Sequence, residues 1–269
     1  MGKSTGKRVL ITGASSGIGA ALALEYAQQG AVLFLTARRL ERLQALAEKI
    51  RALGGRAECA EMDVCDTASV QAATEKAAAA MGGIDILIAN AGFGVVGKIE
   101  TLPLDDYRRQ FETNIFGVIR SVQAAYPWLK KSRGSIAVIG SVNGWVALPG
   151  NSPYSMSKHA IRAFTDALWL EAHADGIRVT HISPGFISTE IRQIDNQGKR
   201  HTGHKDPIPA WLMATPQHTA KVIRKAVEAG KREKSITGHG WWSIHLFRYF
   251  PVLMYHLLRS LKISARGEP

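Results

Sequence analysis

A tyrosine and a lysine four residues apart, Tyr154 and Lys158, have the side chains needed for proton transfer. Pro153 suits the first turn of a helix, and Ser152 or Asn151 can cap the exposed amides before it. On that helix Tyr154 and Lys158 share one face, one turn apart. A phenol titrates near pH ~10, and a nearby ammonium favours the phenolate. The pair predicts a general acid/base centre, although an ordinary helix surface would also show this spacing.

A glycine-rich segment near the N-terminus has the composition of a phosphate-binding turn. Residues 8–11 predict a strand, residues 12–19 a turn, and the Ala/Leu-rich residues up to 29 a helix. Glycines let the backbone approach a ligand, and the start of a helix presents unpaired amides with the positive end of its dipole. The Gly-x-x-x-Gly-x-Gly spacing departs from the Gly-x-Gly-x-x-Gly fingerprint but meets the same need, so it predicts a pyrophosphate site.

Five more apolar runs of strand length alternate with helical segments, at residues 31–36, 56–62, 84–89, 135–140 and 177–183. They predict an α/β protein with a Rossmann-like doubly wound parallel sheet. At 269 residues and 46% hydrophobic, residues 1–269 can form a single domain around a full core. Ligands bind such sheets beyond the carboxyl ends of the strands, which here carry Gly13, Arg38, Asp63, Asn90, Ser141 and Pro184.

The end of the second strand indicates which dinucleotide would bind. An acidic residue there would contact a ribose 2′-hydroxyl, whereas an arginine suits a 2′-phosphate. Ala37 and Arg38 occupy this position, which favours NADP over NAD. The alternative is that Arg38 and Arg39 only begin a solvated helix.

A polar residue interrupts the apolar side of a predicted long helix over residues 103–131. Asn114 lies between Phe111 and Ile115, and its amide needs partners if it is buried. This makes Asn114 a candidate functional residue.

Composition removes several classes of function. Cys59 and Cys65 are too few for a disulfide framework and are expected to be reduced, and His201 and His204 lie in a Gly/Lys-rich stretch, so no metal is expected. The net charge of +12 comes without a nucleic-acid-binding signature, so no nucleic acid is expected. Ser141 has no base or acid at a triad spacing, which argues against a hydrolase. Without a secretory signal, we expect a cytoplasmic protein.

Taken together, the chain resembles the classical short-chain dehydrogenase/reductase family over about two-thirds of its length. The matching residues are Thr12-Gly13-Ala14-Ser15-Ser16-Gly17-Ile18-Gly19, Asp63-Val64, Asn90-Ala91-Gly92, Asn114, Ser141, Tyr154-Ser155-x-Ser157-Lys158 and Pro184-Gly185-Phe186-Ile187-Ser188-Thr189. Individually these motifs are weak, but their order and number make the resemblance specific.

The resemblance implies a role for each matching position. The pyrophosphate region would be held by Gly13, Ser15, Ser16, Gly17, Ile18 and Gly19, the adenine by Asp63 and Val64, and the 2′-phosphate by Arg38. The adenosine ribose and the pocket floor would be bordered by Asn90, Ala91 and Gly92, and the nicotinamide amide would be positioned by Ile187 and Thr189. Pro184, Gly185, Tyr154 and Lys158 would also contact the cofactor. Tyr154 would be the general acid/base and Ser141 would polarise the carbonyl. Lys158 would hold the nicotinamide ribose and lower the pKa of Tyr154, while Asn114 would maintain a water relay.

These roles predict an NADP(H)-dependent oxidoreductase that interconverts a ketone or aldehyde and its alcohol. Residues 93–97 and 142–150 are mostly apolar, so a small hydrophobic substrate is expected, with a variable substrate lid at about 186–216. Trp145 fits either the substrate pocket or plain packing, and Lys199, Arg200 and Lys205 fit either a solvated lid or an anionic acyl group. The alternative function is a non-catalytic NADP-binding sensor or scaffold.

The C-terminal residues depart from the family pattern. A short strand is expected near 235–237, followed by an amphipathic helical extension over about 239–269, where Met254, Leu257, Leu258 and Leu261 recur at helical spacing. Aromatic and cationic residues at 241–263 suit peripheral contact with a membrane, against packing on the fold, a dimer contact or a lid. The resemblance also implies a homodimer or homotetramer formed through the helices at 103–131 and 152–174.

Overall fold

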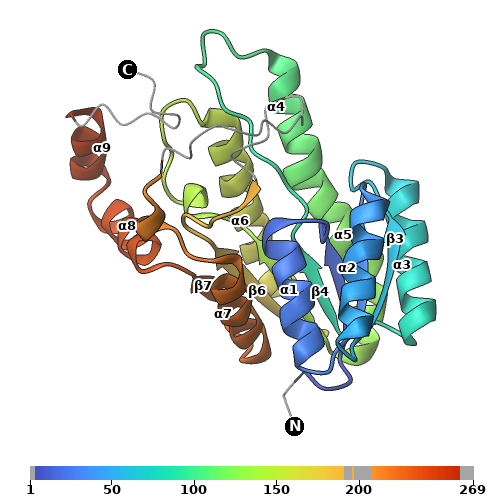
Figure 1. The fold of residues 1–269 in the computed structure, drawn as a ribbon. Coiled ribbons are helices and arrows are strands. Elements are labelled where there is room, and N and C mark those ends of the chain that lie inside the picture. Colours follow the sequence, from blue (N-terminus) through green and yellow to red (C-terminus); the bar gives the residue numbers. More distant parts are fainter. Residues whose placement is uncertain (1–3, 191–195, 197–207, 261–269) are drawn as a thin grey trace.

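The computed structural model describes residues 4–190, 196 and 208–260. Within this part of the chain, seven parallel strands form one sheet in the order β3-β2-β1-β4-β5-β6-β7 (Figure 1). The strands are β1 (Arg8–Thr12), β2 (Val32–Ala37), β3 (Arg56–Glu61), β4 (Ile86–Ala89), β5 (Ser135–Ile139), β6 (Arg178–Ser183) and β7 (Glu233–Ser235). The chain runs from β1 to one edge and then crosses to β4 and on to the other edge. This is the predicted doubly wound, Rossmann-like arrangement.

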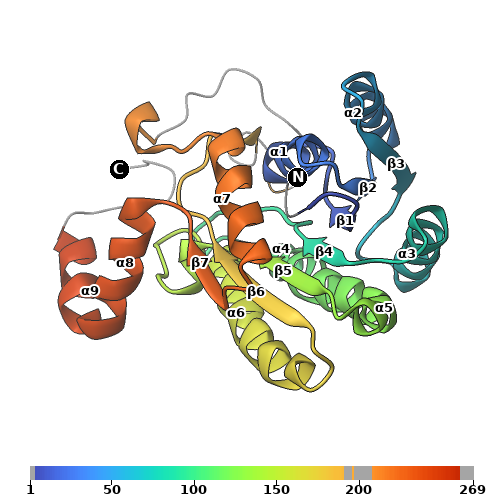
Figure 2. The ribbon, with the colours of Figure 1, turned by 90° about the horizontal axis from the view of Figure 1, so that it is seen from below.

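Helices cover both faces of the sheet (Figure 2). One face carries α1 (Gly17–Gln28), α2 (Leu40–Ala52) and α7 (Pro216–Glu228), and the other carries α3 (Thr67–Met81), α5 (Gly117–Ser132) and α6 (Ser152–His173). Successive strand residues point to opposite faces, so Val9 and Ile11 join the first core and Leu10 the second. Burial on both faces explains why the strands are continuous apolar runs.

The long helix predicted at 103–131 contains a local change of winding. It consists of α4 (Leu104–Phe111), a π-helical turn (Glu112–Phe116) and α5, which follow one another without a gap. The predicted long helix is therefore present, with a π turn inside it that the sequence did not indicate. Asn114 lies in the π turn with 1% of its surface exposed. Such turns insert one extra residue and redirect side chains, often at functional sites. The buried amide and the altered winding therefore coincide.

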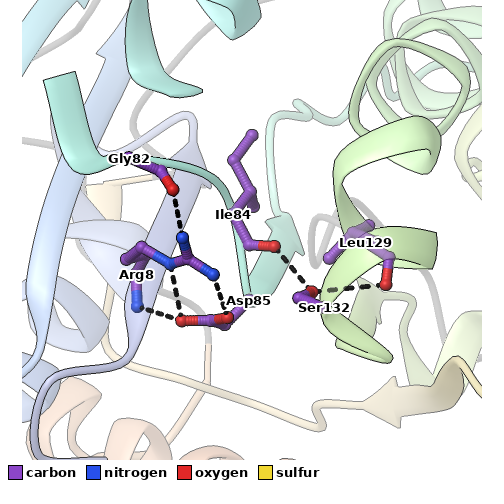
Figure 3. A network of polar contacts seen from close by, with 6 residues as sticks. All are labelled: Arg8, Gly82, Ile84, Asp85, Leu129 and Ser132. Atoms are coloured by element: carbon purple, nitrogen blue, oxygen red, sulfur yellow. Dashed lines mark hydrogen bonds and ion pairs between the residues drawn. The ribbon is translucent and has the colours of Figure 1, made fainter. Parts of the chain in front are cut away.

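Polar contacts fix the amino ends of the central strands, away from the predicted ligand edge (Figure 3). The Asp85 carboxylate accepts from Arg8 through the backbone N and Nε, both at 2.9 Å, and through Nη2 at 2.6 Å. Ser132 at the end of α5 donates to the Ile84 carbonyl oxygen at 2.8 Å. Burial alone would raise the pKa of Asp85, but the bonds from Arg8 hold it below its ordinary value. These contacts tie β1, β4 and α5 together.

The C-terminal extension is two helices, α8 (Gly238–Tyr249) and α9 (Pro251–Ser260). Phe250 leaves the helical conformation with φ −131° and ψ 52°, as expected for a residue before proline. Of the predicted apolar series, Met254 and Leu258 are half-buried, whereas Leu257 is exposed. The short strand predicted at 235–237 lies two residues earlier, as β7, and pairs with β6.

The predicted lid at 186–216 is described only at its two ends. Ile187 forms a parallel bridge with Ala214, and a 3₁₀ turn spans Ala210–Leu212. Lys199, Arg200, His201, His204, Lys205 and Leu261 lie outside the described residues. None of the helices in the described part of the chain combines the length and apolar character needed to cross a membrane.

Candidate active site

Lys158 is held inside the fold between α6 and the end of β5. Its side chain is 7% exposed, and its Nζ donates to the Ile139 carbonyl oxygen at 2.9 Å. Nζ also lies 5.6 Å from the centroid of the Tyr154 ring, so the predicted pair is brought together. Burial lowers the pKa of Lys158 to about 8. The site therefore holds an ammonium that titrates close to neutral pH.

The start of α6 differs from the expected capping. Pro153 does occupy the first turn, but the Asn151 side chain at the cap position makes no capping hydrogen bond. The Ser152 hydroxyl instead pairs with the Tyr107 hydroxyl of α4 at 2.7 Å. The polar residues before Tyr154 thus fix α6 against α4 rather than satisfying the first amides of α6.

Ser141 follows β5 and begins a single 3₁₀ turn, Val142–Gly144. Its Oγ accepts from the Asn143 amide at 3.1 Å, and its side chain is nearly buried. A Cβ on Gly144 would lie 2.7 Å from the Lys158 carbonyl oxygen, so only glycine lets this turn rest on α6. The end of β5 therefore places Ser141 and Lys158 on neighbouring parts of one surface.

Asn114 clamps the segment after β4 to α6. Its Nδ2 donates to the Phe93 carbonyl oxygen at 3.0 Å and to Ser157 Oγ at 3.2 Å, and its Oδ1 accepts from the Phe93 amide at 3.0 Å. These bonds satisfy the amide that looked out of place in the sequence. They give Asn114 a positioning role next to Lys158, and the water relay stays a prediction.

Gln110 makes a parallel clamp that the sequence analysis missed. It is completely buried, its Oε1 accepts from the Val95 amide at 2.6 Å, and its Nε2 donates to the Phe93 carbonyl oxygen at 2.8 Å. The segment it holds passes the Tyr154 ring, because a Cβ on Gly94 would lie 3.7 Å from that ring. Gln110 lies four residues before Asn114, on the same face of the predicted helix, and this spacing was the sequence feature that could have indicated its role.

The glycine turn, residues 12–19, is joined to the end of β4 by hydrogen bonds. Thr12 Oγ1 accepts from the backbone amides of Asn90 and Ala91, both at 3.0 Å. The Asn90 side chain donates to the carbonyl oxygens of Thr12 at 3.0 Å and Gly13 at 3.1 Å. Asn90 therefore supports the turn from behind, a contact that sequence reasoning did not assign to it. The left-handed φ of +65° at Gly13 allows this turn.

The other predicted cofactor residues gather around the same edge. Thr189 approaches Gly17, since a Cβ on Gly17 would lie 3.4 Å from Thr189 Cγ2, and the Pro184 carbonyl oxygen accepts from the Val142 amide at 2.9 Å. At the end of β3, Asp63 Oδ1 accepts from the Cys65 amide at 2.9 Å, and Val64 is buried. The residues that border this edge are Gly13, Ser15, Ser16, Gly17, Ile18, Gly19, Asp63, Val64, Asn90, Ala91, Gly92, Pro184, Gly185, Ile187 and Thr189.

Two neighbouring arginines behave differently at the end of β2. Both side chains are exposed, and Arg39 Nη2 donates to Ser15 Oγ at 2.9 Å and to Ser16 Oγ at 3.0 Å. The sequence analysis singled out Arg38 for the 2′-phosphate, and that role stays a prediction. It did not give Arg39 a place beside the glycine turn, because the direction of a side chain at a strand end depends on packing.

Trp145 is engaged by the fold. Its Nε1 donates to Ser183 Oγ at 3.3 Å, and the Arg162 guanidinium lies 3.4 Å from its ring centroid. This contact is a cation–π interaction, and it favours the packing interpretation of Trp145 over a place in the substrate pocket.

Comparison with known proteins identifies the family. The model for short chain dehydrogenases matches residues 7–200. The chain belongs to the short-chain dehydrogenase family. It is therefore an oxidoreductase by family, and the resemblance found in its motifs is confirmed.

Individual short-chain dehydrogenases match along most of the chain. The 11-beta-hydroxysteroid dehydrogenase A of Sesamum indicum is 34% identical over 275 residues, which cover 98% of this chain and 78% of that protein. A short chain dehydrogenase from Burkholderia cenocepacia, solved in complex with NADP, is 32% identical with a TM-score of 0.78, covering 88% of this chain and 98% of that one. A Burkholderia phymatum member in complex with NAD shares the fold, with a TM-score of 0.84 at 23% identity over 100% of this chain and 99% of that one.

Proposed function

We propose that this short-chain dehydrogenase is an NADP(H)-dependent oxidoreductase that interconverts a hydrophobic ketone or aldehyde and its alcohol, with Tyr154 as general acid/base. The observation that carries the proposal is the buried Lys158 ammonium, which is fixed by Ile139 and lies 5.6 Å from the Tyr154 ring centroid. Burying a cation costs free energy, and buried ionisable groups of this kind cluster at functional sites. The position of Lys158 beside a phenol therefore supports a catalytic role for the pair. The Sesamum indicum relative, a hydroxysteroid dehydrogenase by name, supports this class of reaction.

The glycine turn fits a dinucleotide phosphate. The helix α1 starts at Gly17 after an extended Ser16, whose side chain does not cap the first amides. These amides and the helix dipole favour an anion, with Arg39 adding a positive charge at Ser15 and Ser16. That charge and Arg38 support NADP over NAD, as does the neighbour solved with NADP. When bound, the nicotinamide supplies or accepts the hydride.

The chain's own residues handle the proton and the developing charge. In the reducing direction Tyr154 donates a proton to the carbonyl oxygen, and in the oxidising direction it accepts one. The positive charge of Lys158 stabilises the phenolate that remains after donation. Ser141 accepts from Asn143 through its oxygen, so its hydroxyl proton is directed to the substrate oxygen. Asn114 and Gln110 hold the segment that packs on Tyr154.

The apolar segments at residues 93–97 and 142–150 support a hydrophobic substrate. Val95 and Val146 are buried, and Gly94 brings the backbone of its segment against the tyrosine ring. Apolar walls with a few polar groups are typical of sites for small hydrophobic molecules. We therefore place steroid-like and long-chain ketones, aldehydes and alcohols first among the substrates to test.

The test is a panel of carbonyls and alcohols with NADPH, NADH and the oxidised forms, run on the purified protein and on Tyr154→Phe. We expect turnover with a hydrophobic substrate, which Tyr154→Phe lowers by about 10²–10⁴-fold with little change in NADPH affinity. Tyr126→Phe is the matched control, because the Tyr126 hydroxyl bonds Asp175 at 2.9 Å on the outer side of α5. Full activity in Tyr154→Phe would refute the role of this tyrosine.

The alternative function, a non-catalytic NADP-binding sensor or scaffold, makes the opposite prediction. NADPH would bind, and no substrate of the panel would be turned over. Ser141 is present, and Lys158 lies beside the ring of Tyr154, which argues for chemistry.

We also propose assembly as a homodimer or homotetramer through α4–α5 and α6. Exposed apolar side chains on these helices support it, with Leu104 at 62% and Leu170 at 68% exposure. Sedimentation velocity of Leu170→Glu against the unmodified protein tests it, and an unchanged assembly would argue against α6 as an interface.

A further inference from the structure

The two C-terminal helices form an apolar surface that the enzymatic proposal does not use. On α8 the outward stripe contains Trp242, Leu246 and Tyr249, exposed by 62%, 38% and 65%. On α9, Val252 and Leu253 are exposed by 70% and 65%. The C-terminal apolar surface consists of the exposed side chains of Trp241, Trp242, Leu246, Tyr249, Phe250, Val252, Leu253, Tyr255 and Leu257.

This surface is rigidly attached to the domain. The inner side of α8 is buried at Gly240, Ile244 and Phe247, and a Cβ on Gly240 would lie 2.8 Å from Val142 Cγ2. Thr237 caps the helix by accepting from the Gly240 amide at 3.2 Å. The two faces of α8 therefore have separate functions: one packs on the fold and the other is presented to the surroundings.

The second helix is fixed to the first by an aromatic contact. The rings of Phe247 and Tyr255 meet edge to face, with centroids 5.2 Å apart. No residue of α9 is buried. Apolar side chains exposed in this number on two successive helices are typical of an interaction site.

The charge of the two helices indicates whether this surface contacts a second copy of the chain or a lipid membrane. From Gly238 to Ser260 the chain has Arg248 and Arg259 but no aspartate or glutamate, within a protein of net charge +12. In a two-fold contact between copies of this face, both sets of cations would meet without an acidic partner. An anionic lipid surface supplies the missing negative charge, and tryptophan and tyrosine are the aromatic residues favoured at the membrane–water boundary.

We propose that the C-terminal apolar surface binds the protein to the surface of an anionic lipid bilayer. The apolar side chains enter the boundary between headgroups and acyl chains, and Arg259 pairs with lipid phosphates. The Arg248 guanidinium instead lies 5.8 Å from the centroid of the Trp145 ring, against the fold. Helices of 12 and 10 residues lie in the interface rather than across the bilayer. The binding is peripheral and depends on both apolar contact and charge.

The bilayer would then lie next to the catalytic turn. The first turn of α8 packs on Val142, the residue after Ser141, and the ring of His239 stacks on Phe186 with centroids 5.4 Å apart. A hydrophobic substrate concentrated in the membrane would reach the site without crossing water. This consequence rests on the proposed function, whereas the membrane binding itself does not.

Vesicle co-sedimentation of the full chain tests the proposal. We expect binding to vesicles of phosphatidylcholine mixed with phosphatidylglycerol, weaker binding to phosphatidylcholine alone, and a loss of affinity as salt is added. The double variant Trp242→Glu with Leu253→Glu should require at least about tenfold more lipid for half-maximal binding. Leu53→Glu is the matched control, since Leu53 is also a leucine with 68% exposure but lies at the end of α2.

A second variant separates charge from folding. Arg259→Gln should weaken binding to the anionic vesicles by about fivefold and leave binding to neutral vesicles unchanged. Thermal unfolding of each variant confirms that the fold is retained, and Tyr154→Phe should bind vesicles like the unmodified protein even though its turnover is lost.

Three results would overturn the proposal. They are no binding to anionic vesicles, the same loss in Leu53→Glu as in the double variant, or an assembly that the double variant dissociates while vesicle binding is absent. The last result would assign the surface to contact with a second copy of the chain.

Discussion

Lys158 of α6 donates its Nζ hydrogen to the carbonyl oxygen of Ile139, the last residue of β5, across 2.9 Å. This bond fixes the ammonium at the carboxyl edge of the sheet and beside the ring of Tyr154. Ser141 is two residues beyond Ile139, so one strand end positions both groups. The predictions below begin from this arrangement.

The buried lysine should make stability depend on pH. The pKa of Lys158 is lowered to about 8 in the folded protein, against about 10.4 for an ordinary lysine. Between these values the unfolded chain binds more protons, so the free energy of unfolding rises as pH increases from about 8 to about 10.4, and this group changes it little below about 8. The free energy of unfolding of the unmodified protein, relative to Lys158→Met, should therefore grow by about 3 kcal/mol across this window.

Urea unfolding at the two ends of the window measures this change. Lys76→Met is the control, because Lys76 is exposed on α3, and its difference from the unmodified protein should stay flat. A flat difference for Lys158→Met as well would contradict the lowered pKa.

The arginine at the glycine turn should set the preference between the two dinucleotides. Arg39→Ala removes a guanidinium that bonds Ser15 and Ser16, and the lost charge-assisted bonds to a phosphate are worth about 1.5–3 kcal/mol. If Arg39 makes these bonds to the 2′-phosphate in the proposed NADP site, the KM for NADPH should rise about ten- to hundredfold, with a much smaller rise for NADH. Steady-state kinetics with Arg38→Ala alongside shows how the two arginines share the contact. Equal effects on NADPH and NADH would refute the preference for NADP.

The glycine at the first turn of α1 should not tolerate a methyl group. A Cβ on Gly19 would lie 2.5 Å from the Gly13 carbonyl oxygen and 2.6 Å from Asn90 Nδ2. Alanine usually stabilises a helix, but here we expect Gly19→Ala to lower the free energy of unfolding by about 1–3 kcal/mol and to weaken NADPH binding. Gly238→Ala at the start of α8 has open space and should be neutral. Fluorescence titration and urea unfolding provide both measurements, and a stabilised Gly19→Ala would contradict the close packing.

The ion pair at the opposite edge should affect stability and not catalysis. Asp85→Asn weakens the bonds from Arg8 shown in Figure 3, which should cost about 1–3 kcal/mol near neutral pH. Because the folded-state pKa of Asp85 is lowered, its contribution is present above pH about 4 and is lost as pH falls below that value. The unfolding curves of Asp85→Asn and of the unmodified protein should therefore differ at neutral pH and converge at acidic pH. Turnover per folded molecule should be the same in both proteins. A loss of turnover would show that this edge communicates with the site.

The sequence by itself determined the fold class and the edge on which the site lies. Apolar runs of strand length alternate with helical segments, and parallel strands bring their carboxyl ends to one edge. The residues after each strand, such as Gly13, Asn90 and Ser141, therefore had to lie along one edge. The strand order then made these three neighbours, because β1, β4 and β5 are adjacent. The helical spacing of Tyr154 and Lys158 likewise placed them one turn apart, because helix geometry is local.

Only the tertiary structure decided which side chains meet across the fold. The turn at Asn114 is π-helical, and Gln110 has a similar positioning role. Both side-chain amides form hydrogen bonds with backbone groups of Phe93 and Val95, which are distant in sequence. Arg39 reaches the glycine turn, a contact that the sequence did not indicate, since the direction of a side chain at a strand end depends on its neighbours. Periodicity also showed α9 to be amphipathic without showing its environment. Burial depends on what packs against a helix, and that is a property of the whole fold.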